Sequence, residues 1–160
     1  MTGKAKAEIR QARSLESEAF VFLLRTADAL LREVEETLKN SGLSQTQYNV
    51  LRILRGAGPA GLACREIGNR MITRDPDITR LLDRLEARGL VSRARERSDR
   101  RVVTSRITAQ GLRMLRQLDE PISLLHRRQF RNVPARRLRL LVSLLEQARE
   151  RDGTRLEEST

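Results

Sequence analysis

Apolar residues recur at three- and four-residue spacings over long stretches of this chain, which is the pattern of amphipathic helices. The first stretch runs over 15–39, and its apolar positions are Leu23, Ala27, Leu30, Leu31, Val34 and Leu38. Gly42 follows as a C-terminal cap. Two stretches with similar spacing, 112–130 and 135–151, lie near the other end of the chain. The pattern therefore predicts long helices at both ends, and Thr108 is the expected N-cap of the helix that contains 112–130.

Shorter helices are predicted between the long ones. Ser44 and Gln47 have the spacing of a capping box, so a helix should follow over about 45–55. The stretch 56–61 reads GAGPAG and breaks the chain. Residues 64–71 then read as another short helix, followed by a turn.

The next helix has the clearest start and stop signals. Asp75 is the expected N-cap and Pro76 the first helical residue, with Asp77 as a favourable charge beside the helix dipole. Gly89 should end the helix. Its buried positions are expected to be Ile78, Leu81, Leu82 and Leu85.

Directly after this helix comes the run RARERSDRR at 93–101, with five arginines in nine positions. The flanking stretches GLVSR and VVTSRIT carry β-branched residues in short alternation, as paired strands do. We therefore expect a β-hairpin with the charged run at its tip. A solvated run of like charge is the alternative. Arg93 and Arg95 would lie on the hairpin stem, where they would contact phosphates at most.

The composition limits the kinds of partner that the chain is expected to bind. The chain has 160 residues, a net charge of +11 and a sequence pI near 11.3, which point to nucleic acid or an acidic membrane surface. Aromatic residues make up only 2%, so duplex DNA is favoured over single strands, which proteins usually bind by stacking. No bilayer-spanning run or signal peptide is evident, and the single cysteine agrees with a reducing compartment, so a cytoplasmic protein is expected.

Two helices, a tight turn and a hairpin in this order predict a winged helix-turn-helix, whose second helix enters the major groove. The expected fold class is mainly α with a small β-hairpin wing. A DNA-binding lobe is expected at 43–107, and a helical dimerisation lobe at 1–42 and 108–160, because the end helices carry more Leu and Val than a small middle domain could cover. The candidate DNA-binding residues are Arg65, Arg74, Asp77, Thr79, Arg80, Arg84, Arg95, Arg97, Ser98, Asp99, Arg100 and Arg101.

The stretches LSQTQYNVLRIL, DITRLLDRLEARGLVSR, SDRR and ITAQG, in this order, resemble the MarR family of bacterial transcription regulators. The resemblance implies an obligate homodimer with interlocking terminal helices that binds a pseudo-palindromic operator. It places Thr79 and Arg80 on the recognition helix and makes Asp99 and Arg101 the paired acid and arginine of the wing. It also implies a repressor whose DNA affinity a small molecule lowers. The chain departs from the family at Ala63-Cys64, where a Ser or Thr cap is common.

Several residues keep two interpretations. Phe20, Leu24, Tyr48 and Leu51 are candidates for an effector pocket, with core or dimer packing as the alternative. Cys64 could sense oxidants or be an inert packed thiol. Asp83, Arg84, Glu86 and Arg88 could be solvated helix charges. His126 has no accompanying cluster of metal ligands, so neither a metal nor another cofactor is expected.

Other function classes fit the sequence less well. With one His, one Cys and no nucleophile–base pair to name, the chain is not expected to be an enzyme. A winged protein that binds structured RNA or acts as an assembly module is the main alternative. The third hypothesis is a winged protein-interaction module that binds no nucleic acid.

Overall fold

A computed structural model describes residues 14–72, 77–95 and 102–150 of the chain. The backbone forms two compact units, Met1–Ile122 and Ser123–Thr160. The expectations for Arg74, Asp75 and Pro76, and for the wing-tip residues Arg97, Ser98, Asp99, Arg100 and Arg101, fall outside the described residues.

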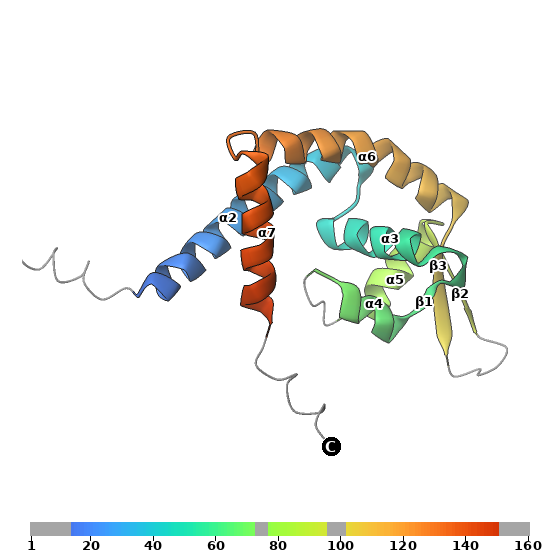
Figure 1. The fold of residues 1–160 in the computed structure, drawn as a ribbon. Coiled ribbons are helices and arrows are strands. Elements are labelled where there is room, and N and C mark those ends of the chain that lie inside the picture. Colours follow the sequence, from blue (N-terminus) through green and yellow to red (C-terminus); the bar gives the residue numbers. More distant parts are fainter. Residues whose placement is uncertain (1–13, 73–76, 96–101, 151–160) are drawn as a thin grey trace, which may run out of the picture. The chain divides into compact units, whose positions relative to one another are not determined.

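The chain is mainly helical, with one small sheet (Figure 1). The elements in chain order are α2 (Leu15–Leu38), the 3-10 helix η1 (Lys39–Ser41), α3 (Gln45–Ala57), the 3-10 helix η2 (Gly58–Ala60), β1 (Leu62–Ala63), α4 (Cys64–Arg70), α5 (Ile78–Ala87), β2 (Val91–Arg95), β3 (Val103–Ile107), α6 (Ala109–Gln129) and α7 (Ala135–Arg149). The predicted long helices, short helices and hairpin are thereby confirmed. The predicted fold class is confirmed as well.

Local capping signals explain where three of these helices begin or end. The Ser44 hydroxyl accepts from the Gln47 N–H at 3.2 Å, and the Gln47 side chain accepts from the Ser44 N–H at 3.1 Å, so the predicted capping box is present. Thr108 caps α6 as expected, because its hydroxyl accepts from the Gly111 N–H at 3.1 Å. Gly42 follows η1 with φ of 63°, a left-handed conformation that glycine adopts without steric cost.

The start of α5 differs from the prediction. Asp77, not Asp75, is the N-cap, because its carboxylate accepts from the Arg80 N–H at 3.2 Å and the helix begins at Ile78. Asp75 and Asp77 flank a proline, and both carry the local signals of a cap. Sequence alone therefore misplaced the cap by two residues.

The sheet has the antiparallel strand order β1-β3-β2. In the predicted hairpin, Val91 pairs with Ile107 and Arg95 with Val103. Strand β1 pairs Leu62 with Ser105 and was not predicted, because two residues are too few to show an alternating pattern.

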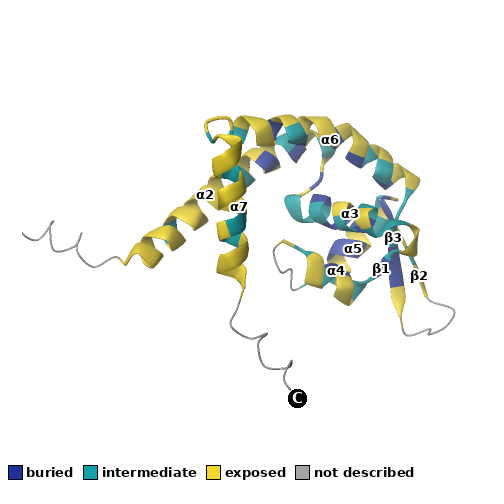
Figure 2. Cartoon of the chain, in the orientation of Figure 1, coloured by how far each residue is buried: buried dark blue, intermediate teal, exposed yellow. Residues whose placement is uncertain are grey.

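The core of the first unit lies between α3, α4, α5 and the sheet (Figure 2). Its fully buried large side chains are Leu38, Leu51, Leu54, Ile67, Leu82, Leu85, Leu90 and Leu115. Ile78, expected in the buried stripe of α5, is half-buried. Most of α2 is exposed, and α7 contains no buried residue, although it carries five leucines and a valine. Each of these helices therefore presents apolar surface that its own unit does not cover.

Candidate nucleic-acid interface

Helices α4 and α5 form the helix-turn-helix pair. They approach closely at Gly68, where an added Cβ would lie 2.6 Å from the Ile78 Cδ1, so a larger side chain would displace the Ile78 side chain. The segment after α4 is also attached to α3, because the Asn49 side chain accepts from the Ile72 N–H at 3.0 Å. Asn49 was not singled out from the sequence, since it lies 23 residues from its partner and no local spacing reports such a contact.

The outward face of α5 carries the residues expected to read DNA. Thr79, Arg80 and Arg84 are exposed, while Leu81, Leu82 and Leu85 face the core. Thr79 and Arg80 lie in the first turn of α5, and Arg84 in its last turn. Exposed polar side chains near a helix N-terminus are what a major-groove helix presents to bases and phosphates. The arrangement agrees with the sequence-based assignment of this helix.

Asp77 takes a structural position at the start of this face. Its carboxylate caps α5 and also accepts from the Arg80 Nε at 3.0 Å. The Arg80 side chain is nevertheless 77% exposed, so this surface ion pair holds the guanidinium only weakly. Asp77 therefore acts mainly as the cap of α5 and pairs with Arg80 only at the surface.

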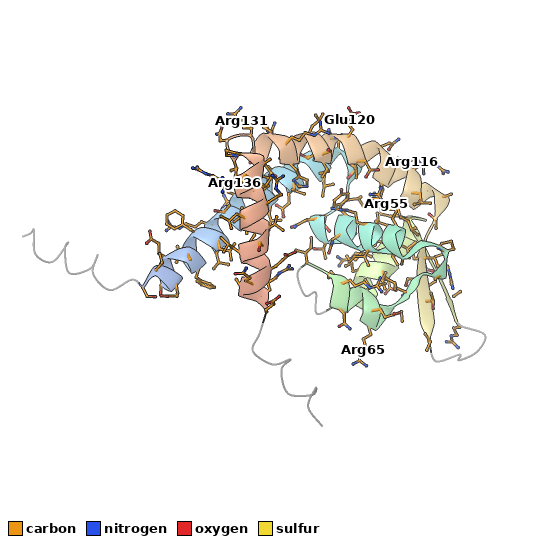
Figure 3. The ribbon with its side chains drawn as sticks, in the orientation of Figure 1. Arg55, Arg65, Arg116, Glu120, Arg131 and Arg136 are labelled. Atoms are coloured by element: carbon orange, nitrogen blue, oxygen red, sulfur yellow. The ribbon has the colours of Figure 1, made fainter. Side chains whose placement is uncertain are left out.

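Arg65 is exposed in the first turn of α4 and extends away from the helix (Figure 3). Ala63 cannot accept from the first turn as a Ser or Thr cap would, but the other half of a capping box is present, because the Glu66 carboxylate accepts from the Ala63 N–H at 2.9 Å. Arg65 is thus available to a phosphate without disturbing the helix start.

Arg93 was expected to face phosphates, but its side chain points to acidic residues of α5. Its guanidinium Nε donates to Glu86 at 2.8 Å, and its Nη2 also pairs with Asp83 and with Glu86, both on α5. The side chain is only 23% exposed. Hydrogen bonding to Glu86 is the main cause that raises the pKa of Arg93.

This arrangement corrects two interpretations. Arg93 connects the wing to the recognition helix instead of facing phosphates, and Asp83 and Glu86 are its partners, although Asp83 remains exposed to solvent. Arg95, two residues further along β2, remains exposed as expected. No sequence spacing indicated the Arg93 contacts, because they run between a helix and a strand.

The effector-pocket candidates occupy two environments in the first unit. Phe20 and Leu24 are exposed on α2, at 61% and 54%, whereas Tyr48 and Leu51 are buried in α3. Burial raises the pKa of Tyr48, and the Arg52 guanidinium lies 5.8 Å from the centre of its ring. Tyr48 and Leu51 thus contribute to the core, and the two residues on α2 lie on uncovered apolar surface.

Cys64 and His126 are the remaining candidates for a redox or metal site. Cys64 is half-buried at the start of α4, and the exposed His126 lies 3.0 Å from the Gln129 side chain oxygen through its Nδ1. Among the residues that the structure describes, no three His, Cys, Asp or Glu side chains group closely enough to hold a metal ion. Within the same residues, no helix is both long and apolar enough to cross a bilayer.

The sequence profile of the MarR family matches residues 43–103, which contain the helix-turn-helix and most of the hairpin. The chain is 36% identical over 106 residues to the HTH-type transcriptional regulator TtmR of Methylorubrum extorquens strain PA1. This match covers 66% of the chain and 53%, about half, of that regulator.

Two solved structures extend the likeness over most of the chain. The MarR transcription factor from Planctomyces limnophilus is 42% identical with a TM-score of 0.66, and the match covers 86% of this chain and 99% of that one. CouR from Rhodococcus jostii RHA1, solved with p-coumaroyl-CoA bound, is 28% identical with a TM-score of 0.73 over 86% of this chain and 95% of CouR. Together with the winged helix-turn-helix geometry, these matches establish that the chain belongs to the MarR family of transcription regulators.

Proposed function

We propose that this protein is a homodimeric, sequence-specific regulator that binds double-stranded DNA and represses transcription. The observation that carries the proposal is the exposed row of Thr79, Arg80 and Arg84 on α5, directly followed by a strand that carries the exposed Arg95. A helix with this exposed face fits the major groove, and the adjacent hairpin reaches the neighbouring backbone.

Charge is concentrated where DNA would bind. Residues 43–107 contain fourteen arginines and seven acidic residues, which gives +7 of the chain's net +11. Residues 1–42, by contrast, contain seven basic and seven acidic residues. Neutralising phosphates and releasing their counterions supplies much of the affinity for DNA. The proposed DNA-binding lobe is therefore 43–107.

We assign the DNA contacts by exposure and position. The proposed contact residues that the structure describes are Arg65, Thr79, Arg80, Arg84 and Arg95, with Asp77 as the cap at the start of their helix. The wing-tip residues 97–101 and Arg74 lie outside the described residues and are proposed contacts on their sequence alone. Arg101 at the tip would enter the minor groove, where arginine is favoured by the enhanced negative potential.

The dimerisation lobe is proposed to consist of 1–42 and 108–160. Large exposed apolar side chains on two helices support this assignment, because contiguous apolar surface normally marks an interaction site. These side chains are Leu15, Phe20, Phe22, Leu23, Leu24, Leu140, Leu141, Val142 and Leu144. A two-fold dimer would cover them and place two copies of α5 on successive turns of DNA.

The regulatory consequences follow from this arrangement. A dimer bound across two grooves would block other proteins from the same DNA, which supports a repressor. Because CouR is solved with p-coumaroyl-CoA bound, we propose a small-molecule effector for this chain too, near Phe20, Leu24, Tyr48 and Leu51. The family consists of transcription regulators, which are not enzymes, and we propose neither catalysis nor a cofactor here. Binding to bacterial genomic DNA would place the protein in the cytoplasm.

The test is selection of duplexes from a random DNA library by the purified full chain, followed by binding measurements across a salt series. We expect enrichment of a pseudo-palindrome that the protein binds about 10³-fold or more above random DNA. Arg84→Ala should weaken this binding. Arg116→Ala, which removes an exposed arginine from α6, should not (Figure 3).

Two results would overturn the proposal. One is the absence of any enriched duplex sequence. The other is tighter binding to a structured RNA hairpin than to the enriched duplex at equal salt concentration, which would favour the RNA-binding alternative.

A further inference from the structure

The last turn of α5 is attached to the end of the N-terminal helix by one side chain. Arg88, the half-buried C-cap of α5, donates from Nη1 to the Gly42 carbonyl at 2.7 Å and from Nη2 to the Ser41 carbonyl at 3.0 Å. These carbonyls lie at the end of the continuous segment α2–η1, where helix carbonyls lack intrahelical partners and carry partial negative charge. The planar guanidinium satisfies both with its parallel donors.

The residues directly after α5, 88–90, are also bonded to the start of α6. The Arg88 carbonyl accepts from the Gln110 side chain at 3.3 Å, and the Gly89 carbonyl accepts from the Thr108 hydroxyl at 2.6 Å. The Leu90 carbonyl accepts from the Thr108 N–H at 3.1 Å. The C-terminus of the recognition helix is thus bonded to the two points where the chain enters and leaves the proposed DNA-binding lobe.

Arg88 differs in this respect from the other arginines of α5. Arg80 and Arg84 project from the exposed face, whereas the Arg88 guanidinium bonds backbone carbonyls 46 and 47 residues earlier in the chain. A guanidinium occupied in this way does not face DNA. It instead bonds the C-terminal end of α5 to the end of the α2–η1 segment.

We propose that Arg88 is a positioning residue that determines which operator half-site spacing the dimer accepts. The inference rests on the proposed function. In a two-fold dimer, the separation and angle of the two α5 helices depend on how rigidly each is attached to the helices that meet at the axis. Arg88 supplies this attachment on the α2 side, and the Thr108 and Gln110 contacts supply it on the α6 side.

Spacing is a sensitive readout of such rigidity. One base pair between half-sites changes their separation by about 3.4 Å and their relative rotation by about 35°, since one helical turn takes about 10 base pairs and 34–36 Å. If α5 is firmly attached, it cannot follow the changed half-site position, so the affinity for that DNA falls. A loosely attached helix adjusts to it.

The experiment compares the parent protein, Arg88→Ala, Arg88→Lys and Arg116→Ala on the enriched palindrome and on versions with one base pair inserted or removed at its centre. The parent should lose about 10-fold or more in affinity for each changed spacing, in line with the cost of a defective contact in each half-site. Arg88→Ala should bind the original spacing about 3- to 10-fold more weakly but lose less than about 3-fold on changed spacing. Arg88→Lys keeps the charge and the fold but lacks the planar fork, so its profile should lie between the two.

Arg116→Ala removes the same charge from an exposed site and should keep the parent profile. The inference would be overturned if Arg88→Lys showed the same dependence of affinity on half-site spacing as the parent. It would also be overturned if a folded Arg88→Ala protein kept the parent's dependence on spacing.

A second measurement does not need DNA. It determines the distance between spin labels attached at Thr79→Cys in the two protomers, in a Cys64→Ser background. Arg88→Ala should broaden this distribution, and an unchanged width would overturn the inference. Broadening in a protein that enriches no duplex would leave the positioning role standing and overturn only the proposed function.

Discussion

Glu86 binds both the backbone and the guanidinium of Arg93. The Glu86 carboxylate accepts from the Arg93 backbone N–H at 3.0 Å through one oxygen and from the Arg93 Nε at 2.8 Å through the other. One carboxylate thus holds both the backbone of β2 and a side chain on that strand. The wing and the recognition helix are connected through this contact and through Asp83.

Removing this connection should cost both stability and DNA binding. Arg93→Ala leaves Glu86 and Asp83 as unpaired like charges on α5, so the free energy of unfolding should fall by about 1–2 kcal/mol. Arg95→Ala is the matched control on the same strand and should change this free energy by less than about 0.5 kcal/mol. Chemical denaturation measures both. Equal stability of the two variants would contradict the assigned role of Arg93.

Arg80 and Arg95 should differ in the kind of DNA contact that they make. Arg80→Ala should lose about 1–3 kcal/mol of binding to the selected duplex and much less to random DNA, if the side chain reads a base. Arg95→Ala should weaken binding to both duplexes alike and reduce the slope of log affinity against log salt by about 1. Titrations of both duplexes over a salt series measure these effects.

Asp77→Asn is the control for Arg80. Asparagine caps a helix as well as aspartate does, so α5 should remain intact while the Arg80 partner loses its charge. Binding close to that of the parent is expected. A uniform loss for Arg80→Ala on every duplex would identify it as a phosphate contact instead.

The apolar surface of α7 should be an interface between two copies. Leu144 is 51% exposed in the protomer, so Leu144→Glu would bury a charge in the dimer and should shift the protein toward monomers with weak DNA binding. Gln147→Glu adds the same charge one turn later at an exposed polar position and should remain dimeric. Sedimentation equilibrium reports the masses. A dimeric Leu144→Glu protein would place the interface elsewhere.

The single tyrosine offers a spectroscopic test of the core. Burial raises the pKa of Tyr48 above its ordinary value of 10.0, so ultraviolet absorbance should detect tyrosinate only above this pH in the native protein. The stability from the bound proton is fully present below pH 10.0 and is lost as the pH rises through the native pKa. In denaturant the midpoint should return to about 10. Equal midpoints in both states would show that Tyr48 is solvated.

Local signals account for what the sequence predicted correctly. The Ser44–Gln47 capping box, the Thr108 cap and the hairpin strands depend on neighbouring residues, which the sequence displays directly. Contacts between distant residues left no such signal. Arg88 reaches carbonyls more than forty positions away, and its half-burial depends on where α2 ends in space. Asp75 and Asp77 carry the same local cap signals, so local rules alone did not select Asp77.

The strand order β1-β3-β2 leaves β2 at an edge of the sheet. Exposed edges invite pairing with strands of other molecules, and charged side chains oppose it. Arg95 provides such a charge, and Glu86 occupies the Arg93 N–H that an incoming strand would otherwise bond. We therefore expect Glu86 and Arg95 to oppose pairing of β2 with other molecules, so loss of Glu86 should lower the yield of soluble protein even before any DNA is present.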